Sequence, residues 1–316
     1  SPIPNPQSPI PNPQSPKGLQ KVLNFNKENK YNNLKKIFLS NMDKDNIYYS
    51  KDTKGKLLFL RHGETFFNLD PDKQGRVTNS KYVDCHLDEK GIEQSKSLKS
   101  ILNKLSIEKI YISPMYRVFQ TIFYALESHP NSKNITVVVH PLVNEVTSCV
   151  QDYLLNIKQT KQEFNINSKV KFDWSLFDEY VKGIKWDENF YYFDNFNCFE
   201  DNKKNEMYQK LKGFYDLGDF VSFKEGLSEL AKIRYAQNKR FESLKHLQFR
   251  FNKFMEFIKE NHKDSLDNAD DKILVVTHDS LIKCATDRTP YETDDIQEYH
   301  QNSYSAKNCE IISIKF

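Results

Sequence analysis

The chain has 316 residues, of which 38% are hydrophobic and 28% are charged, and its formal net charge is +3. So small a charge gives no reason to expect nucleic acid or an anionic membrane as a partner, and no apolar run reaches the roughly 20 residues of a membrane-spanning helix. The 23 phenylalanines and 17 tyrosines can still form the core of one large domain or two small ones.

The first sixteen residues are SPIPNPQ, the same seven residues again, and SP. Prolines at this density cannot form a helix or a central strand, so residues 1–18 are predicted to be an extended, polyproline-like arm. Two interpretations of residues 1–16 stay open, a disordered tail and an arm that docks on a protein partner. Residues 19–55 are predicted to be a polar N-terminal extension with a short helical part.

From residue 56 onward, short apolar runs alternate with helical patterns. Asp88 is placed to cap a helix that ends near Leu105, Pro114 suits the first turn of the next, and a long helical pattern extends from Leu227 to Ile258. The runs predicted as strands are 56–60, 109–112, 136–140, 272–278 and 310–316. This alternation predicts an α/β fold with a mostly parallel central sheet and helices on both faces.

The stretch from about 151 to 225 breaks this rhythm and is too long for a loop without structure of its own. We predict an inserted lobe, helical or irregular, within a domain that spans 56–316. Its run WDENFYYFDNFNCF (186–199) is dense in aromatic and acidic residues. Packing of the insert on the core explains this run best, and a lid over the substrate or a patch for a protein partner stays open.

Polar side chains, most of them able to carry positive charge, follow four of the predicted strands. Because the carboxyl ends of parallel strands meet at one edge of a sheet, we expect these side chains to share a crevice. Arginines and histidines in one crevice repel each other unless an anion lies between them, and phosphate suits guanidinium groups best. In strand order these residues are Arg61 and His62, Arg117, Glu145, and His278 and Asp279.

A histidine in such a pocket can attack phosphorus, and a carboxyl group beside it can protonate the leaving alkoxide. The pattern therefore predicts a small phosphorylated substrate whose phosphoryl group is transferred to His62. The remaining six histidines show no spacing typical of metal ligands.

Five motifs together resemble the signature of the histidine phosphatase superfamily, also called phosphoglycerate mutase-like. The resemblance covers about 56–145 and 226–316. DCHLDEKG and the late run AKNCEIISI (306–314) are most similar to the fungal phosphomutase-like and plant phosphoglycerate-mutase-like phosphatases of the RHG branch. The motifs are RHGET (61–65) with Asn68, DCHLDEKG (84–91), YISPMYRVFQT (111–121), PLVNE (141–145) and VVTHDS (275–280).

The resemblance implies a role for each matched residue. His62 matches the histidine that becomes phosphorylated, and Glu145 matches the proton donor. Family members need no metal, and we expect no cofactor. The residues that match the phosphate-binding positions are Arg61, Asn68, Arg117 and His278.

Two departures from the family pattern bear on the reaction. Asn144 replaces an arginine that mutases using bisphosphoglycerate commonly have before the glutamate, which argues against a glycolytic mutase. Asp279 follows the second histidine, where the RHG branch usually has Gly or Ser. His-Asp at this point resembles the acid phosphatase branch, in which the aspartate donates the proton, so Asp279 stays open as the alternative to Glu145.

The expected function is hydrolysis of a phosphomonoester through a phosphohistidine. A phosphomutase, or a scaffold subunit that retains the phosphatase fold, are the alternatives. The five scattered cysteines form no C-x-x-C pair, which argues against a disulfide framework and indicates a reducing compartment inside the cell. We expect the cytoplasm, and a mitochondrial or ciliary location would show the same cysteine usage.

Overall fold

The computed structural model describes residues 48–315, apart from 128, 131, 133–134, 168, 184–200, 238–241, 264–270 and 295–297. The predicted arm, most of the N-terminal extension and the aromatic run 186–199 lie outside the described residues. Among the helices that are described, none has both the length and the apolar character needed to cross a bilayer.

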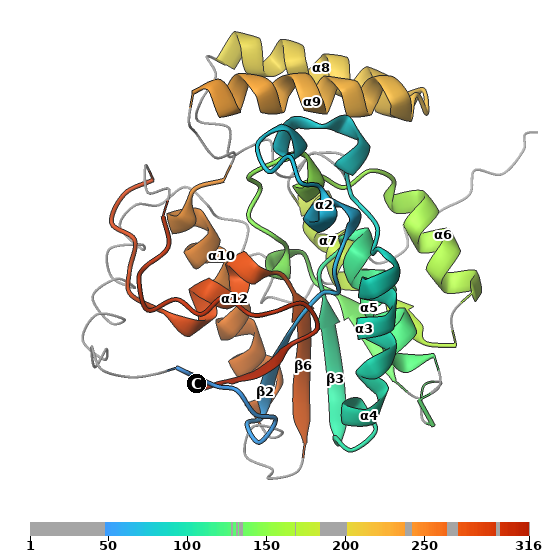
Figure 1. Ribbon diagram of the computed structural model, residues 1–316, viewed down its shortest axis with the longest axis vertical. Coiled ribbons are helices and arrows are strands. Elements are labelled where there is room, and N and C mark those ends of the chain that lie inside the picture. Colours follow the sequence, from blue (N-terminus) through green and yellow to red (C-terminus); the bar gives the residue numbers. More distant parts are fainter. Residues whose placement is uncertain are drawn as a thin grey trace, which may run out of the picture. The chain divides into compact units, whose positions relative to one another are not determined.

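A seven-stranded sheet forms the centre of the described chain, in the order β1-β7-β2-β6-β3-β4-β5 (Figure 1). The pairs β2–β6, β6–β3, β3–β4 and β4–β5 are parallel, whereas β7 is antiparallel to β1 and to β2. The mostly parallel sheet is therefore confirmed. The strands are β1 (Tyr49–Ser50), β2 (Leu57–Arg61), β3 (Ile107–Ile112), β4 (Thr136–Val139), β5 (Lys171–Asp173), β6 (Lys272–Thr277) and β7 (Ile311–Ile314).

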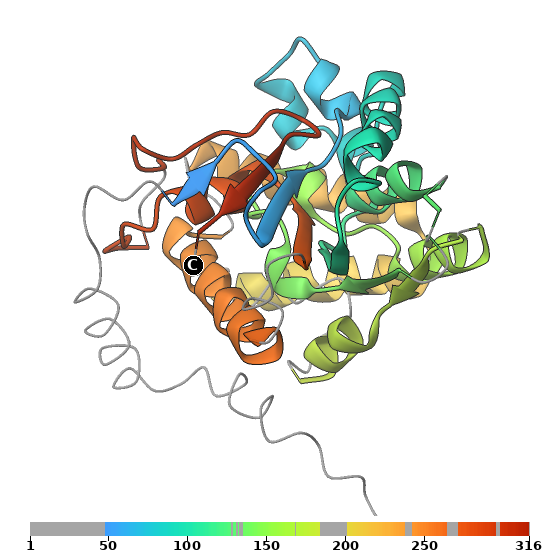
Figure 2. The same cartoon turned by 90° about the horizontal axis from the view of Figure 1, so that it is seen from below.

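Strand β2 is apolar as far as Leu60 because each face of the sheet has its own core. In β2, Leu58 and Leu60 pack on one side and Leu57 and Phe59 on the other, and all four are fully buried. The first side is covered by α3 (Glu89–Ser97), α4 (Lys99–Leu102), α5 (Tyr116–Leu126) and α6 (Ile157–Asn167), and the second by α10 (Leu244–Asn261) and α12 (Asp279–Thr286) (Figure 2). Helices on both faces are thus confirmed.

Of the two helix starts predicted from local signals, the structure confirms one. Asp88 caps α3 as predicted, because its carboxylate accepts a hydrogen bond from the Gly91 amide at 2.7 Å. Pro114 instead lies before α5, which begins at Tyr116. The shorter helices are α2 (Phe66–Leu69), η2 (Gly75–Thr78), η3 (Ser80–Tyr82), η5 (Pro141–Val143), η6 (Val150–Asp152) and α7 (Ser175–Gly183).

The predicted insert contains both a part of the central sheet and extra helices. Strand β5 pairs with β4 and extends the sheet, so the first part of this stretch is not a separate lobe. The helices α8 (Asp201–Asp216) and α9 (Phe220–Ala236) follow it and pack against each other. The long helical pattern through Leu227 and Ile258 is two helices, α9 and α10, rather than one.

Helix α9 packs on the segments that follow β2 and β4. The buried cluster between them includes Leu211, Phe223 and Leu227 from α8–α9, and Tyr82 and Tyr153 from those segments. Figure 1 shows the two helices beyond α2, at one end of the molecule. The α8–α9 pair therefore lies over the same segments that leave the carboxyl ends of the strands.

Candidate active site

The register of the sheet places His62 beside His278. Arg61 is paired with Thr277 in the parallel β2–β6 ladder, and the His62 amide donates to the Thr277 carbonyl at 3.1 Å. The two imidazole rings lie edge to face with their centroids 5.1 Å apart. Two histidines far apart in the sequence thus meet because their strands are neighbours.

Hydrogen bonding leaves His62 with one ring nitrogen free to react. Its Nδ1 is 2.7 Å from the carbonyl oxygen of Gly63. A carbonyl can only accept, so the proton lies on Nδ1 and Nε2 keeps its lone pair. Burial, and then the charges of Arg117 and Arg61, lower the pKa of His62 well below its usual value. The imidazole is therefore neutral, which is the form that can attack phosphorus.

His278 is oriented by a short chain of hydrogen bonds. The Ser113 hydroxyl donates to Asn144 Oδ1 at 2.7 Å, so towards His278 Nε2, which is 2.8 Å away, it can only act as the acceptor. His278 Nδ1 is buried and has no partner in the described chain. Asn144, the residue that departs from the mutase pattern, thus helps to fix the orientation of the His278 ring.

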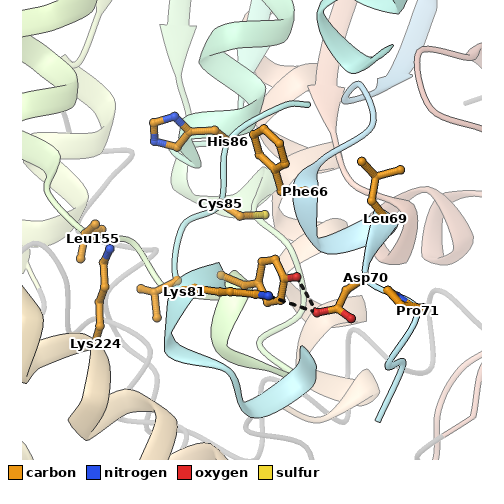
Figure 3. A pocket seen from close by; sticks show the side chains of 11 residues that line it. Phe66, Leu69, Asp70, Pro71, Lys81, Cys85, His86, Leu155 and Lys224 are labelled. Atoms are coloured by element: carbon orange, nitrogen blue, oxygen red, sulfur yellow. Dashed lines mark hydrogen bonds and ion pairs between the residues drawn. The ribbon is translucent and has the colours of Figure 1, made fainter. Parts of the chain in front are cut away.

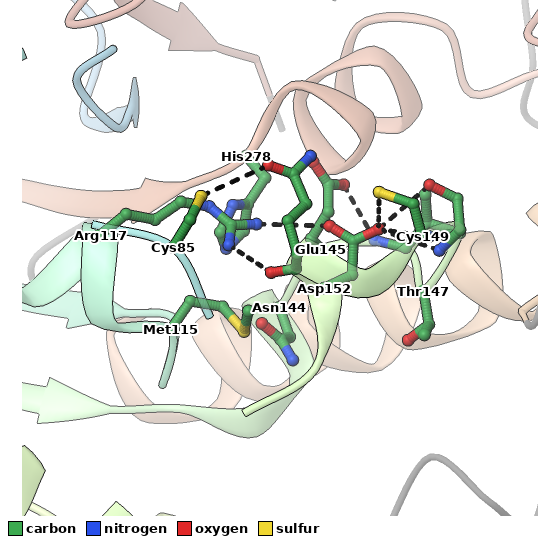
Figure 4. Close-up of polar contacts among 12 residues, drawn as sticks. Cys85, Met115, Arg117, Asn144, Glu145, Thr147, Cys149, Asp152 and His278 are labelled. Carbon is green, nitrogen blue, oxygen red and sulfur yellow. Dashed lines mark hydrogen bonds and ion pairs between the residues drawn. The ribbon is translucent and has the colours of Figure 1, made fainter. Parts of the chain in front are cut away.

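Arg117 lies at the start of α5 and is fully buried. Its Nη1 donates to the Gln151 carbonyl at 2.8 Å, and Nη2 is 3.4 Å from the Asp152 carboxylate (Figure 4). Nε has no partner in the described chain. Sequence reasoning missed Asp152, because it follows no predicted strand.

Arg61 is partly exposed and held from two sides. Nη1 donates to the Ala306 carbonyl at 2.5 Å and is 3.7 Å from the Asp279 carboxylate. Nε is buried without a partner in the described chain. Asp279 also accepts from the Ser305 hydroxyl at 2.8 Å and pairs with Lys283 at 2.8 Å. Its carboxylate is therefore surrounded by donors and cations.

Glu145 has a different environment from Asp279. Its carboxyl group is buried and accepts from the Val146 amide at 2.8 Å and from Ser280. Burial, and then the negative charge of Asp152, raise the pKa of Glu145 to about 7. Asp152 has the charge because Arg117, the Ser148 amide and hydroxyl and the Cys149 amide all donate to it. Glu145 is the member of this pair that keeps a proton.

Close backbone packing fixes the turn that carries His62. A Cβ atom on Gly63 would lie 2.6 Å from the Gly91 carbonyl oxygen, and one on Gly91 would collide with the Glu64 carbonyl. This contact explains why both RHGET and DEKG contain a glycine. From the other side, Asn308 Nδ2 and the Cys309 amide donate to the His62 carbonyl at 3.0 and 3.3 Å.

Asn68 lies on α2, and its side-chain oxygen takes part in the N-terminal cap of this helix. Its Oδ1 accepts from the Thr65 amide at 3.1 Å and from the Thr65 hydroxyl at 3.0 Å. Any contact of Asn68 with phosphate would have to come from its amide NH2 group. Its role in phosphate binding stays a prediction.

A hollow of about 620 Å³ lies beside this site (Figure 3). None of the seven predicted site residues lines it, but Cys85 does, and Cys85 Sγ also contacts Gln151 Oε1 at 3.7 Å, next to Arg117. The volume of the hollow lies in the range of small-molecule pockets. The lining residues are Phe66, Leu69, Asp70, Pro71, Lys81, Tyr82, Val83, Cys85, His86, Leu155 and Lys224.

Residues 57–163 match the family model of the histidine phosphatase superfamily, branch 1. The matched region contains His62, Arg117 and Glu145. The resemblance of its motifs to the superfamily is thereby confirmed, while the fungal and plant subgroup stays a prediction.

Two relatives are 2,3-bisphosphoglycerate-dependent phosphoglycerate mutases, from Lactobacillus acidophilus and Lactobacillus johnsonii. Each is 34% identical to the chain over 74 residues, which cover 23% of this chain and 30% of the relative. The chain thus spans less than a third of the length of these curated relatives.

Two solved structures show distant likeness. The ecdysone phosphate phosphatase from Bombix mori, in complex with tungstate, is 13% identical with a TM-score of 0.39, over 81% of this chain and 86% of that chain. A mycobacterial glucosyl-3-phosphoglycerate phosphatase is 16% identical with a TM-score of 0.35, over 72% and 76%. TM-scores this low support no statement about substrate or mechanism.

Proposed function

We propose that the chain hydrolyses a phosphomonoester through a phosphohistidine on His62. The observation that carries this proposal is a set of three buried nitrogens without a partner in the described chain, Arg61 Nε, Arg117 Nε and His278 Nδ1. Buried polar nitrogens normally have hydrogen-bond partners, and these three come from residues that follow neighbouring strands. A phosphoryl group supplies oxygens for all of them, and its charge offsets the two guanidinium groups.

The first half of the reaction transfers the phosphoryl group to the protein. His62 Nε2 attacks phosphorus, the bond from phosphorus to the ester oxygen breaks, and Glu145 gives its proton to that oxygen. Arg61 and Arg117 stabilise the negative oxygens of the transition state. Burial, and then the charge of Arg117, lower the pKa of His278, whereas the negative phosphoryl oxygens favour its protonated form. In that form Nε2 donates to Ser113 and Nδ1 donates to the phosphoryl group.

The second half returns the protein to its starting state. Glu145, now a carboxylate, takes a proton from water as the water oxygen attacks phosphorus. The bond between phosphorus and His62 Nε2 breaks, inorganic phosphate leaves, and Glu145 is protonated again. In a phosphomutase, the alternative, an acceptor hydroxyl of the substrate would replace this water.

A polyol phosphate that is labelled in its phosphoryl group and has free hydroxyl groups separates these functions. We expect the label to appear in inorganic phosphate, because water is the acceptor in the proposed second step. Label retained on an organic product would indicate a phosphomutase. A protein that binds tungstate but releases no phosphate from any ester would be a scaffold that retains the pocket.

The proton donor can be identified by the leaving group. Glu145→Gln should slow an alkyl phosphate at least about tenfold more than a nitrophenyl phosphate, since nitrophenolate leaves without a proton. Asp279→Asn is the matched amide substitution and should show no such difference, because Asp279 is engaged by Arg61, Lys283 and Ser305. The measurement is kcat/KM for both esters. The reverse result would make Asp279 the donor, as in the acid phosphatase branch.

The same carboxyl group gives the reaction a pH signature. The pKa of Glu145 is raised to about 7, so its proton is present in mildly acidic solution and is lost as the pH rises through about 7. The low pKa of His62 keeps the nucleophile neutral over this range. Turnover of the alkyl ester should therefore fall above about pH 7, and this decrease should be absent in Glu145→Gln.

We also propose an intracellular, reducing location and a protein partner that binds residues 1–16 or 186–199. The cysteine usage supports the location, and Cys85, Cys149 and Cys284 are buried free thiols. The repeated proline arm and the aromatic run support the partner, and both segments lie outside the described residues.

A further inference from the structure

Glu145 belongs to a buried segment without regular secondary structure. Residues 144–147 form neither helix nor strand, and all four are buried. Backbone carbonyls in such a segment can reach neither water nor a helix or sheet partner, so they need donors from elsewhere. The position of the Glu145 carboxyl group depends on what supplies those donors.

Arg250, on α10, supplies several of them. Nη1 donates to the carbonyls of Leu142 at 2.7 Å and Asn144 at 3.2 Å, and Nη2 donates to the carbonyl of Glu145 at 3.2 Å. The Arg250 side chain is buried. One rigid guanidinium therefore holds two carbonyls of this segment, those of Asn144 and Glu145, and the Leu142 carbonyl just before it.

Glu242 in turn fixes Arg250 and the far end of the segment. Arg250 Nε and Nη2 donate to its two carboxylate oxygens at 2.6 and 2.9 Å. Glu242 also accepts from the Thr147 amide at 3.2 Å, and its own amide donates to the Thr147 carbonyl at 3.0 Å. Burial alone would raise the pKa of Glu242, but the charge of Arg250 and the hydrogen bonds from His246 and Arg250 lower it to about 2.

We propose that Arg250 and Glu242 are positioning residues for proton donation. Their hydrogen bonds to the backbone fix residues 142–147. The Glu145 carboxyl group is thereby kept where it can protonate the leaving oxygen. This inference rests on the proposed function, in which Glu145 is the donor. A pair that only stabilised the fold would affect all substrates alike, whereas a positioning pair affects most the substrates that need a proton.

Arg250→Lys tests this difference with little change in charge. A lysine ammonium cannot hold three carbonyls and a carboxylate in the geometry of a guanidinium. We expect kcat/KM for an alkyl phosphate to fall about tenfold more than for a nitrophenyl phosphate. Ile258→Val, a fully buried substitution on the same helix, is the control and should change both rates by one factor.

A second variant keeps the test valid if Arg250→Lys does not fold. A second measurement, hydrogen exchange, keeps it valid if the chain does not turn over either ester. Glu242→Gln/Arg250→Met removes both charges together, which avoids a buried charge without a partner. In either variant, the amides of 144–147 should exchange hydrogen faster, while those of α3 stay unchanged. Exchange needs no turnover, so a wild-type chain inactive on both esters would count against the proposed function alone. Unchanged exchange, or equal losses on the two esters, would overturn the positioning role.

Discussion

His62→Ala should abolish turnover, with a loss of at least about 10⁴-fold in kcat, as for removal of other catalytic nucleophiles. The reason is that Nε2 of His62 is the reacting atom of the proposed mechanism, and its lone pair is kept free by the bond from Nδ1 to Gly63. The phosphoenzyme should disappear together with turnover. The measurement is a rapid quench with labelled substrate, followed by digestion.

In the wild-type chain, the label should be acid-labile and base-stable and should lie on the peptide that contains His62. His262→Gln is a matched control, since His262 is a buried histidine that contacts Tyr111 Oη at 2.6 Å and lies outside the site. It should keep both label and turnover. Label on a different residue, or label that survives in His62→Ala, would end the proposed mechanism.

Arg117→Ala should cost roughly 2–4 kcal/mol of transition-state stabilisation, or about 30- to 1,000-fold in kcat/KM. Arg117 brings its charge into a fully buried position, where a charge acts more strongly than in water. Arg117→Lys should lose less, because it keeps the charge but not the planar guanidinium. Inhibition by tungstate should weaken in the same order.

The alanine variant has a side effect that needs its own control. Removing Arg117 leaves the buried Asp152 carboxylate without its ion-pair partner, which is destabilising by itself. The double variant Arg117→Ala/Asp152→Asn removes that charge too and should regain stability in a thermal melt without regaining activity. A loss below about tenfold would mean that Arg117 does not contact the phosphoryl group.

The residues that the sequence could place are those that follow long apolar strands. Four strands are recognisable in the sequence because their apolar runs are buried on both faces of the sheet, namely β2, β3, β4 and β6. A polar residue that follows such a run therefore stands out. This rule predicts Arg61, His62, Arg117 and His278 as site residues. It also predicts Glu145, although the strand before Glu145 ends six residues earlier, at Val139.

Other parts of the site have no such signal. Asp152 ends the short 3-10 helix η6, which follows no predicted strand, and only the position of the Arg117 guanidinium gives it a role. Arg250 donates to backbone carbonyls more than 100 residues earlier in the chain, and an amino-acid sequence does not show which carbonyls need a donor. β5 has three residues, Lys171–Asp173, too few to show a period.

The position of β6 has a consequence for how the chain reaches its native state. β6 lies between β2 and β3, although both of these are synthesised more than 160 residues earlier. Until residue 277 has left the ribosome, the inner edges of β2 and β3 have no partner, and unpaired strand edges invite aggregation. Contacts this distant in sequence also slow folding. Nascent and truncated chains should therefore depend on chaperones that the finished protein no longer needs.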